Sequence, residues 1–236
     1  MQDMCGRYTI SSSLKEIRAL FSVSVEVSHS RNFEARYNVA PSNTVPIISA
    51  SDQGNRLTFM SWGMKPLQQH LVNKAGNLIN ARSETLDKKV SFRDSFLRRR
   101  CLIPANGYYE WPKQNIGKKQ PSLISLKEKT LFGLAGIWQA YTDISGNVFH
   151  SFAIITTRAA VSISHIHHRM PLIISNQDYD TWLYASSAEA KPMMQPYCNH
   201  LQSHMVSERV NNPTNDDKSL VDPVFNGGDP TQLSLL

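Results

Sequence analysis

Cys5 is the first side chain of the sequence that could carry out covalent chemistry. It follows the residues MQDM and precedes Gly6 and Arg7. If the preceding residues were removed, Cys5 would carry a free α-amine and a thiol on adjacent carbons. Because chain ends are usually exposed, we expect an exposed thiol whose pKa is lowered by Arg7. The alternative is a buried structural cysteine, which is our interpretation of Cys101 and Cys198.

Glu110 is a candidate proton-transfer group. It lies between aromatic residues in the segment NGYYEWP, residues 106–112. Aromatic neighbours remove water from a carboxylate, which raises its pKa toward a value useful for general acid–base catalysis. The alternative is an ordinary exposed carboxylate at the end of a strand.

Three histidines, His165, His167 and His168, fall within four consecutive positions. In a strand, His165 and His167 would share a face. No partner cysteines and no nearby acidic cluster accompany them, which argues against a metal site. A single catalytic imidazole beside Arg169 is the better functional interpretation.

Two further polar segments are candidates for binding. Asn80, Arg82 and Glu84 follow a short apolar pair and combine an amide, a guanidinium and a carboxylate. The basic run 98–100, with Arg93 nearby, could bind phosphates. That run could equally be the solvated end of a helix, where cations are favoured by the helix dipole.

The composition is that of a globular protein in a reducing compartment. The chain has 236 residues, 41% of them hydrophobic, which suits one domain with a sizeable core. Apolar runs are too short to cross a membrane, and the first residues lack the pattern of a signal peptide. The three cysteines argue against a disulfide framework, so we expect a cytoplasmic protein. The net charge of +6 suits a polyanionic partner.

Hydrophobic periodicity and turn residues predict the elements that position these groups. Ser13 to Glu16 forms a capping box, so a short helix follows it. Tyr37 to Pro41 is predicted to be irregular, and 64–77 to be a loop. Further helices are predicted at 91–100, with Phe92, Phe96 and Leu97 inward, and at 176–185, with Trp182 buried. Strands are predicted at 45–50, 56–62, 122–126, 131–138, 148–156, 171–174 and 201–210.

Strands outnumber helices and do not alternate regularly with them. We therefore predict an α+β fold, a single domain with a largely antiparallel, barrel-like β-sheet core and flanking short helices. The domain is expected to span residues 1–224. Residues 225–236 are expected to form a flexible C-terminal tail, because Asn-Gly-Gly-Asp-Pro opens that segment.

Seven short motifs in this order resemble the SOS-response-associated peptidase family, whose members are also called abasic-site-processing proteins. The resemblance runs from Met4 to about Val224. The motifs are MCGRY (4–8), YNVAP (37–41), SWG (61–63), INARSET (79–85), CLIPANGYYEW (101–111), IHHRMP (166–171) and VSERVNNPTNDDKSLVDPV (206–224).

The resemblance implies a protein that recognises abasic sites in single-stranded DNA and forms a covalent thiazolidine crosslink through an N-terminal cysteine. No metal, other cofactor or membrane is implied, and we expect a monomer. By position, the implied catalytic residues are Cys5, Asn80, Glu110 and His167, and Thr156 resembles the family's active-site threonine. The implied DNA-contacting residues are Arg7, Asn38, Arg82, Trp111 and Arg169.

Two alternatives remain open beside the crosslinking reading. One is a cysteine-type peptidase that cleaves its own leader, and the other is a non-covalent module for nucleic acid or modified bases. The sequence also departs from the family twice. Gln2 and Asp3 intervene between Met1 and the cysteine motif, so either Met4 is the start or the preceding residues are cleaved. The loop after Gly63 has no tryptophan to wedge bases apart, and offers Met64, Leu67 and Leu71 instead.

Overall fold

The computed structural model describes residues 5–26, 33–65, 77–112, 120–127, 130–142 and 145–224. Residues 1–4, most of the predicted loop 64–77 and the predicted tail 225–236 lie outside the described residues.

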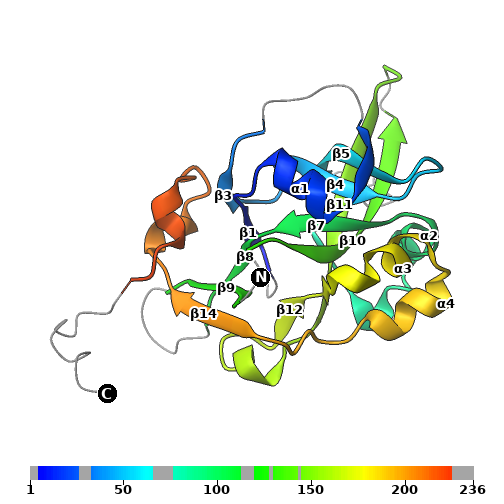
Figure 1. Ribbon diagram of the computed structural model, residues 1–236. Coiled ribbons are helices and arrows are strands. Elements are labelled where there is room, and N and C mark those ends of the chain that lie inside the picture. The colour runs from blue at the N-terminus through cyan, green and yellow to red at the C-terminus, as the bar shows by residue number, and fades with distance from the viewer. Residues whose placement is uncertain are drawn as a thin grey trace, which may run out of the picture.

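The first of two sheets brings the start and the end of the described chain together. Its strand order is β14-β9-β8-β1-β3, and every neighbouring pair is antiparallel. Figure 1 shows this sheet around the N-terminus, with the last strand at its edge. Its strands are β1 (Arg7–Ile10), β3 (Arg36–Val39), β8 (Gly107–Glu110), β9 (Ser122–Leu126) and β14 (Leu201–Met205).

The second sheet closes into a five-stranded barrel. Each strand pairs with the next in the order β11-β10-β7-β4-β5, and β5 pairs back with β11 in parallel. The strands of this sheet are β2 (Val23–Glu26), β4 (Thr44–Ser49), β5 (Asn55–Trp62), β6 (Asn80–Arg82), β7 (Arg100–Ala105), β10 (Phe132–Thr142), β11 (Val148–Arg158), β12 (Arg169–Pro171) and β13 (Ile173–Ile174). The predicted α+β fold with a barrel-like core is therefore confirmed.

Aromatic packing and a glycine allow the barrel to close. At the parallel joint, Trp62 pairs with Phe152, and their rings stack with centroids 6.3 Å apart. On the neighbouring strand, Gly136 lies in the middle of β10. A Cβ at Gly136 would meet Ile103 and lie 2.9 Å from the sulfur of Cys101, so only a hydrogen fits.

The helices are short and lie outside the sheets (Figure 1). The capping box predicted at Ser13 is confirmed, because Ser13 and Glu16 cap each other at the start of the first helix. The α-helices are α1 (Leu14–Leu20), α2 (Val90–Arg98), α3 (Tyr179–Tyr184) and α4 (Ser187–Ala190). Single 3-10 turns cover Ser83–Thr85, Val161–Ile163, Asn176–Asp178, Lys191–Met193, Glu208–Asn211 and Lys218–Val221.

The prediction of regular elements was right for the long hairpins and wrong in several short segments. Tyr37 to Pro41 was predicted as irregular, but Arg36–Val39 forms β3, because it pairs with β1. The predicted last strand stops at Met205 and gives way to a 3-10 turn. Leu97 is 45% exposed rather than inward, whereas Trp182 is buried as predicted.

The basic run 98–100 has structural partners. Arg100 begins β7 and is buried, and it donates hydrogen bonds to the carbonyl oxygens of Phe96, Trp182 and Ala185. Its neighbours Arg98 and Arg99 both pair with Asp94. The helix-end interpretation therefore fits this run better than phosphate binding. No helix within the described ranges is long and apolar enough to cross a membrane.

Candidate active site

Cys5 lies two residues before the start of β1 and is buried, with 1% of its surface exposed. The expectation of an exposed thiol with a lowered pKa is therefore wrong. Burial raises the pKa of the Cys5 thiol well above its ordinary value, and the charge of Glu110 raises it further. The sulfur lies 3.7 Å from the carbonyl oxygen of Arg7, to which it donates a weak hydrogen bond. Cys101 is buried as expected, but Cys198 is exposed.

Asn80 fixes the backbone of Cys5. It begins β6, which pairs in parallel with β11, and the indole of Trp62 donates to the carbonyl of the preceding residue, Ile79, at 2.9 Å. The Asn80 side-chain nitrogen donates to the carbonyl oxygen of Cys5 at 2.9 Å. Its side-chain oxygen is buried and has no hydrogen-bond partner among the described residues. Asn80 therefore holds the backbone of Cys5 through its side-chain nitrogen, and its side-chain oxygen can still accept a hydrogen bond.

Glu110 ends β8 and is 4% exposed. Burial raises the pKa of its carboxyl to about 8 from an ordinary value of 4.5, although a backbone N–H at Trp111 opposes the shift. Its Oε1 atom is buried without a hydrogen-bond partner in the described part of the chain. This matches the prediction of a desolvated glutamate, and a pKa near 8 lets the group both take and give a proton near neutral pH.

His167 is the one of the three clustered histidines that is buried. Its Nδ1 atom lies 4.0 Å from Oε1 of Glu110, too far for a hydrogen bond but within reach of a small rearrangement. The same Nδ1 lies 3.1 Å from the carbonyl oxygen and 3.2 Å from the amide nitrogen of Arg169, so its tautomer decides which bond forms. This supports the single-imidazole interpretation.

Arg169 and Thr156 brace the loop that carries His167. Arg169 pairs with Glu84 at 2.6 Å and donates to the carbonyl oxygen and the hydroxyl of Thr156 at 2.6 and 3.1 Å. Thr156 is fully buried in β11. Both predicted site residues therefore lie in the same cluster as His167, with the guanidinium of Arg169 already ion-paired.

Three of the predicted DNA-contacting residues hold residues 207–216, which we call the C-terminal strap. Arg7 donates to the side chain of Asn38 at 2.9 Å and to the carbonyl of Val210 at 2.6 Å. Trp111 donates from its indole to Asn211 at 2.7 Å. The buried amide of Asn38 donates to the carbonyl oxygens of Val210, Asn212 and Asn215.

Arg82 is different from these residues. It ends β6 two positions after Asn80, is exposed, and has no hydrogen bond or ion pair with another described residue. Its guanidinium is therefore available for an external anion.

Sequence reasoning missed Asp216, Tyr8 and Tyr108. Asp216 accepts hydrogen bonds from the backbone nitrogens of Tyr37 and Asn38 and pairs with Arg36, which anchors the strap to β3. The hydroxyls of Tyr8 and Tyr108 are buried without partners among the described residues. A period of two along β8 could have found Tyr108, because it puts Tyr108 and Glu110 on one face.

The fold and the site together define a small α+β protein in which a cysteine, a carboxylic acid, an imidazole and an amide meet beside a closed barrel. Its centre combines a buried thiol with a buried carboxyl group whose pKa is raised. The chain belongs to the SOS response associated peptidase (SRAP) family, whose model matches residues 4–213.

Curated relatives cover nearly the whole chain. The chain is 33% identical over 223 residues to "Abasic site processing protein YoqW" of Bacillus subtilis, a match that spans 93% of this chain and 99% of that protein. It is 30% identical over 228 residues to "Abasic site processing protein YedK" of Escherichia coli, across 94% and 100% of the two chains. A crystal structure of a protein from Bacteroides thetaiotaomicron is also similar, with a TM-score of 0.82, 25% identity and coverage of 94% and 100%.

Proposed function

We propose that this protein binds single-stranded DNA at abasic sites and forms a covalent thiazolidine crosslink through Cys5, once the residues before Cys5 are removed. The crosslink shields the lesion and is later released. The observation that carries the proposal is the contact of Asn80 with the Cys5 backbone, beside the buried and unpartnered carboxylate oxygen of Glu110. The family and the names of the curated relatives support the same reaction class.

The chemistry requires an amine and a thiol on neighbouring carbons. The ring-opened sugar of an abasic site presents an aldehyde. The free α-amine of Cys5, with an ordinary pKa near 8, attacks the aldehyde carbon, and loss of water gives an imine. The thiol sulfur then bonds to the imine carbon while the nitrogen gains a proton. The product is a five-membered thiazolidine ring.

Glu110 and His167 would move protons in these steps. As an acid, Glu110 would assist the opening of the sugar and the departure of water. As a carboxylate, it would accept the proton of the Cys5 thiol as the ring closes. His167 lies 4.0 Å from Glu110 and would relay protons after a small rearrangement that brings the two side chains into hydrogen-bond distance. The free oxygen of Asn80 would accept a hydrogen bond from the amine or from a sugar hydroxyl.

The same burial argues against the peptidase alternative. A cysteine peptidase needs a thiolate as its first nucleophile, and low-pKa cysteines lie in electropositive surroundings. Burial and the Glu110 carboxyl instead raise the pKa of the Cys5 thiol. In the crosslinking reaction the amine attacks first, so a protonated thiol is no obstacle.

The proposal is tested with two forms of the protein, one that begins at Cys5 and one with the full sequence from Met1. Each is mixed with single-stranded DNA that contains one abasic site. We expect a complex that survives denaturation with the first form, less of it with the second, and none with Cys5→Ala in the first form. If a verified free N-terminal Cys5 gave no such complex, the proposal would be wrong.

Glu110→Gln and His167→Ala in the first form separate chemistry from binding. We expect slower crosslinking or release with nearly unchanged DNA affinity. Loss of DNA binding in either variant would contradict the proton-transfer role. Cleavage of an unrelated peptide that disappears with Cys5→Ala would favour the peptidase alternative.

A further inference from the structure

A pocket opens away from the candidate active site, and none of the predicted site residues lines it. It has a volume of about 570 Å³ and lies between the β4–β5 hairpin and the part of the β10–β11 hairpin that carries Trp138 and His150. Along β11, His150 of the pocket and Thr156 of the site are separated by six residues, or about 20 Å of strand. The pocket is therefore separate from the chemistry around Cys5.

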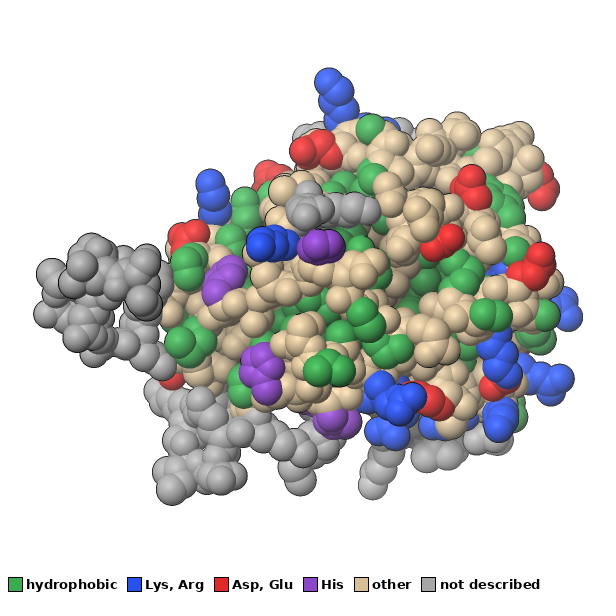
Figure 2. All heavy atoms as spheres, turned by 60° about the horizontal axis from the view of Figure 1, so that its bottom comes forward, with side chains coloured by type: hydrophobic (Ala, Val, Ile, Leu, Met, Phe, Trp, Pro, Cys, Tyr) green, Lys and Arg blue, Asp and Glu red, His purple; other side chains and the backbone are tan. Residues whose placement is uncertain are grey.

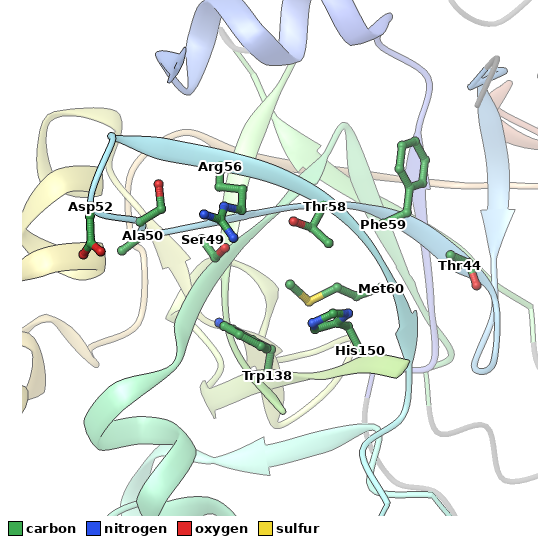
Figure 3. A pocket seen from close by; sticks show the side chains of 11 residues that line it. Thr44, Ser49, Ala50, Asp52, Arg56, Thr58, Phe59, Met60, Trp138 and His150 are labelled. Atoms are coloured by element: carbon green, nitrogen blue, oxygen red, sulfur yellow. The ribbon is translucent and has the colours of Figure 1, made fainter. Parts of the chain in front are cut away.

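One wall of this pocket carries a cation and hydroxyl groups. Arg56, Thr58 and Met60 alternate along β5 and line the pocket. Figure 3 shows the Arg56 side chain pointing inward beside Ser49 and Thr58. Within the described ranges, the guanidinium of Arg56 has no hydrogen bond or ion pair. A cation beside hydroxyl groups is the arrangement that recognises a phosphate.

The opposite wall is aromatic (Figure 3). Trp138 and His150 lie on β10 and β11 with ring centroids 5.6 Å apart. Burial lowers the pKa of His150, so the imidazole is neutral at physiological pH and this wall carries no charge. The charged groups that line the pocket are therefore Arg56 and Asp52, of which Asp52 lies at the far rim from His150 (Figure 3).

We propose that this pocket binds a nucleotide, with its phosphate at Arg56 and its base against Trp138. The pocket volume falls within the range of small-molecule sites. Stacking on an indole suits any base, because every base has a π face. Asp52 can accept a hydrogen bond from an exocyclic amino group. The same chemistry fits a free mononucleotide and one nucleotide of a DNA strand.

Calorimetric titration of the full chain with adenosine 5′-monophosphate tests the proposal. Adenosine and inorganic phosphate, each alone, report on the base and the phosphate. We expect the monophosphate to bind more tightly than either part and to quench tryptophan fluorescence. Arg56→Gln should weaken its binding about tenfold or more and leave adenosine binding unchanged. Arg98→Gln, on the exposed side of α2, is the matched control.

Binding of an undamaged oligothymidylate distinguishes a free mononucleotide from a DNA strand as the natural ligand. If Arg56→Gln weakens oligonucleotide and monophosphate binding alike, the natural ligand is a strand; if only the monophosphate is affected, it is a free nucleotide. Equal affinities for adenosine and its monophosphate, or monophosphate binding unaffected by Arg56→Gln, would overturn the proposal. At saturating DNA, the rate of crosslinking to abasic DNA should stay unchanged in Arg56→Gln whichever ligand the pocket takes, so this test stands apart from the function proposed for Cys5.

Discussion

Glu110 links the chemistry of the site to the stability of the fold. The side chain is almost completely buried, one oxygen lacks a partner within the described ranges, and burial raises its pKa to about 8. A group kept in this state destabilises the folded protein whenever the solvent favours ionisation. Such a cost is common where a site is arranged for catalysis.

The first prediction is a pH dependence of stability that Glu110→Gln removes. Below pH 4.5 the carboxyl is protonated in both states. Between 4.5 and about 8 the unfolded chain releases the proton while the folded protein retains it, so the free energy of unfolding falls as pH rises. The slope is about 1.4 kcal/mol per pH unit.

Urea denaturation at pH 5, 6, 7 and 8 measures this effect. The variant should match the wild type near pH 5 and be more stable by a few kcal/mol at pH 8, since glutamine does not ionise. Parallel stability curves for the two proteins would show that Glu110 has an ordinary pKa.

Arg82 is a single exposed cation two positions from Asn80, and it has no hydrogen bond or ion pair with another described residue. Arg82→Gln should weaken binding to single-stranded DNA and reduce the slope of log affinity against log salt by about 0.7. Salt titrations measure the slope, and Arg98→Gln serves as control. An unchanged slope would remove Arg82 from the phosphate-contacting set.

The candidate site residues were proposed from the sequence, but their environments could be predicted only in part. The aromatic neighbours of Glu110 predicted its desolvation. The burial of Cys5 was not predictable, because it depends on contacts with Asn80 and Glu110, which are distant along the chain. A position near the chain end says nothing about such contacts.

At the scale of elements, the C-terminal strap joins β1, β3 and the end of β8. Asn38 is its central anchor, because its fully buried amide donates to three strap carbonyls and accepts from Arg7. Through Arg7, the bonds hold the strap against the start of β1, two residues after Cys5.

Asn38→Ala should lower the free energy of unfolding by about 2–4 kcal/mol, since it removes three hydrogen bonds to strap carbonyls and the side-chain acceptor of Arg7. Hydrogen exchange of the strap amides should speed up, and denaturant titration gives the energy. Asn199→Ala, at an exposed asparagine, is the matched control. Unchanged stability together with lost DNA binding would mean that Asn38 acts on DNA directly.

Elements with strong local signals were predictable, and those defined by partners were not. The strands predicted at 131–138 and 148–156 correspond to β10 and β11, and the capping box predicted α1. The strand β3 has no such signal. Its four residues are extended because β1 and Asp216 bind their backbone.

At the scale of the whole molecule, barrel closure depends on residues that meet across the interior. Gly136→Ala should destabilise the protein by about 1–3 kcal/mol, because the added methyl group meets Ile103 and Cys101. Thermal unfolding measures the loss, with Ala140→Val on the exposed part of the same strand as control. An unchanged melting temperature would show that the interior can relax.

The sequence predicted a barrel-like sheet but not which strands close it. Closure relies on a parallel contact between β5 and β11, strands about ninety residues apart, and no local pattern encodes such a pairing. The distribution of charged side chains over the surface was likewise not predictable from the sequence. Figure 2 shows acidic side chains scattered over one face and basic ones gathered mainly toward one end, a distribution that the net charge alone does not reveal.

The bond between Arg7 and Val210 spans 203 residues of chain, which has a consequence for synthesis. On the ribosome, Cys5 emerges early, and Asn80, Glu110 and His167 follow in that order. A nascent chain halted before His167 carries the cysteine without its imidazole, and one halted before Val210 lacks the strap. Translation thus delivers Cys5 first and assembles its surroundings last, so that truncated products hold Cys5 without the groups proposed to assist it.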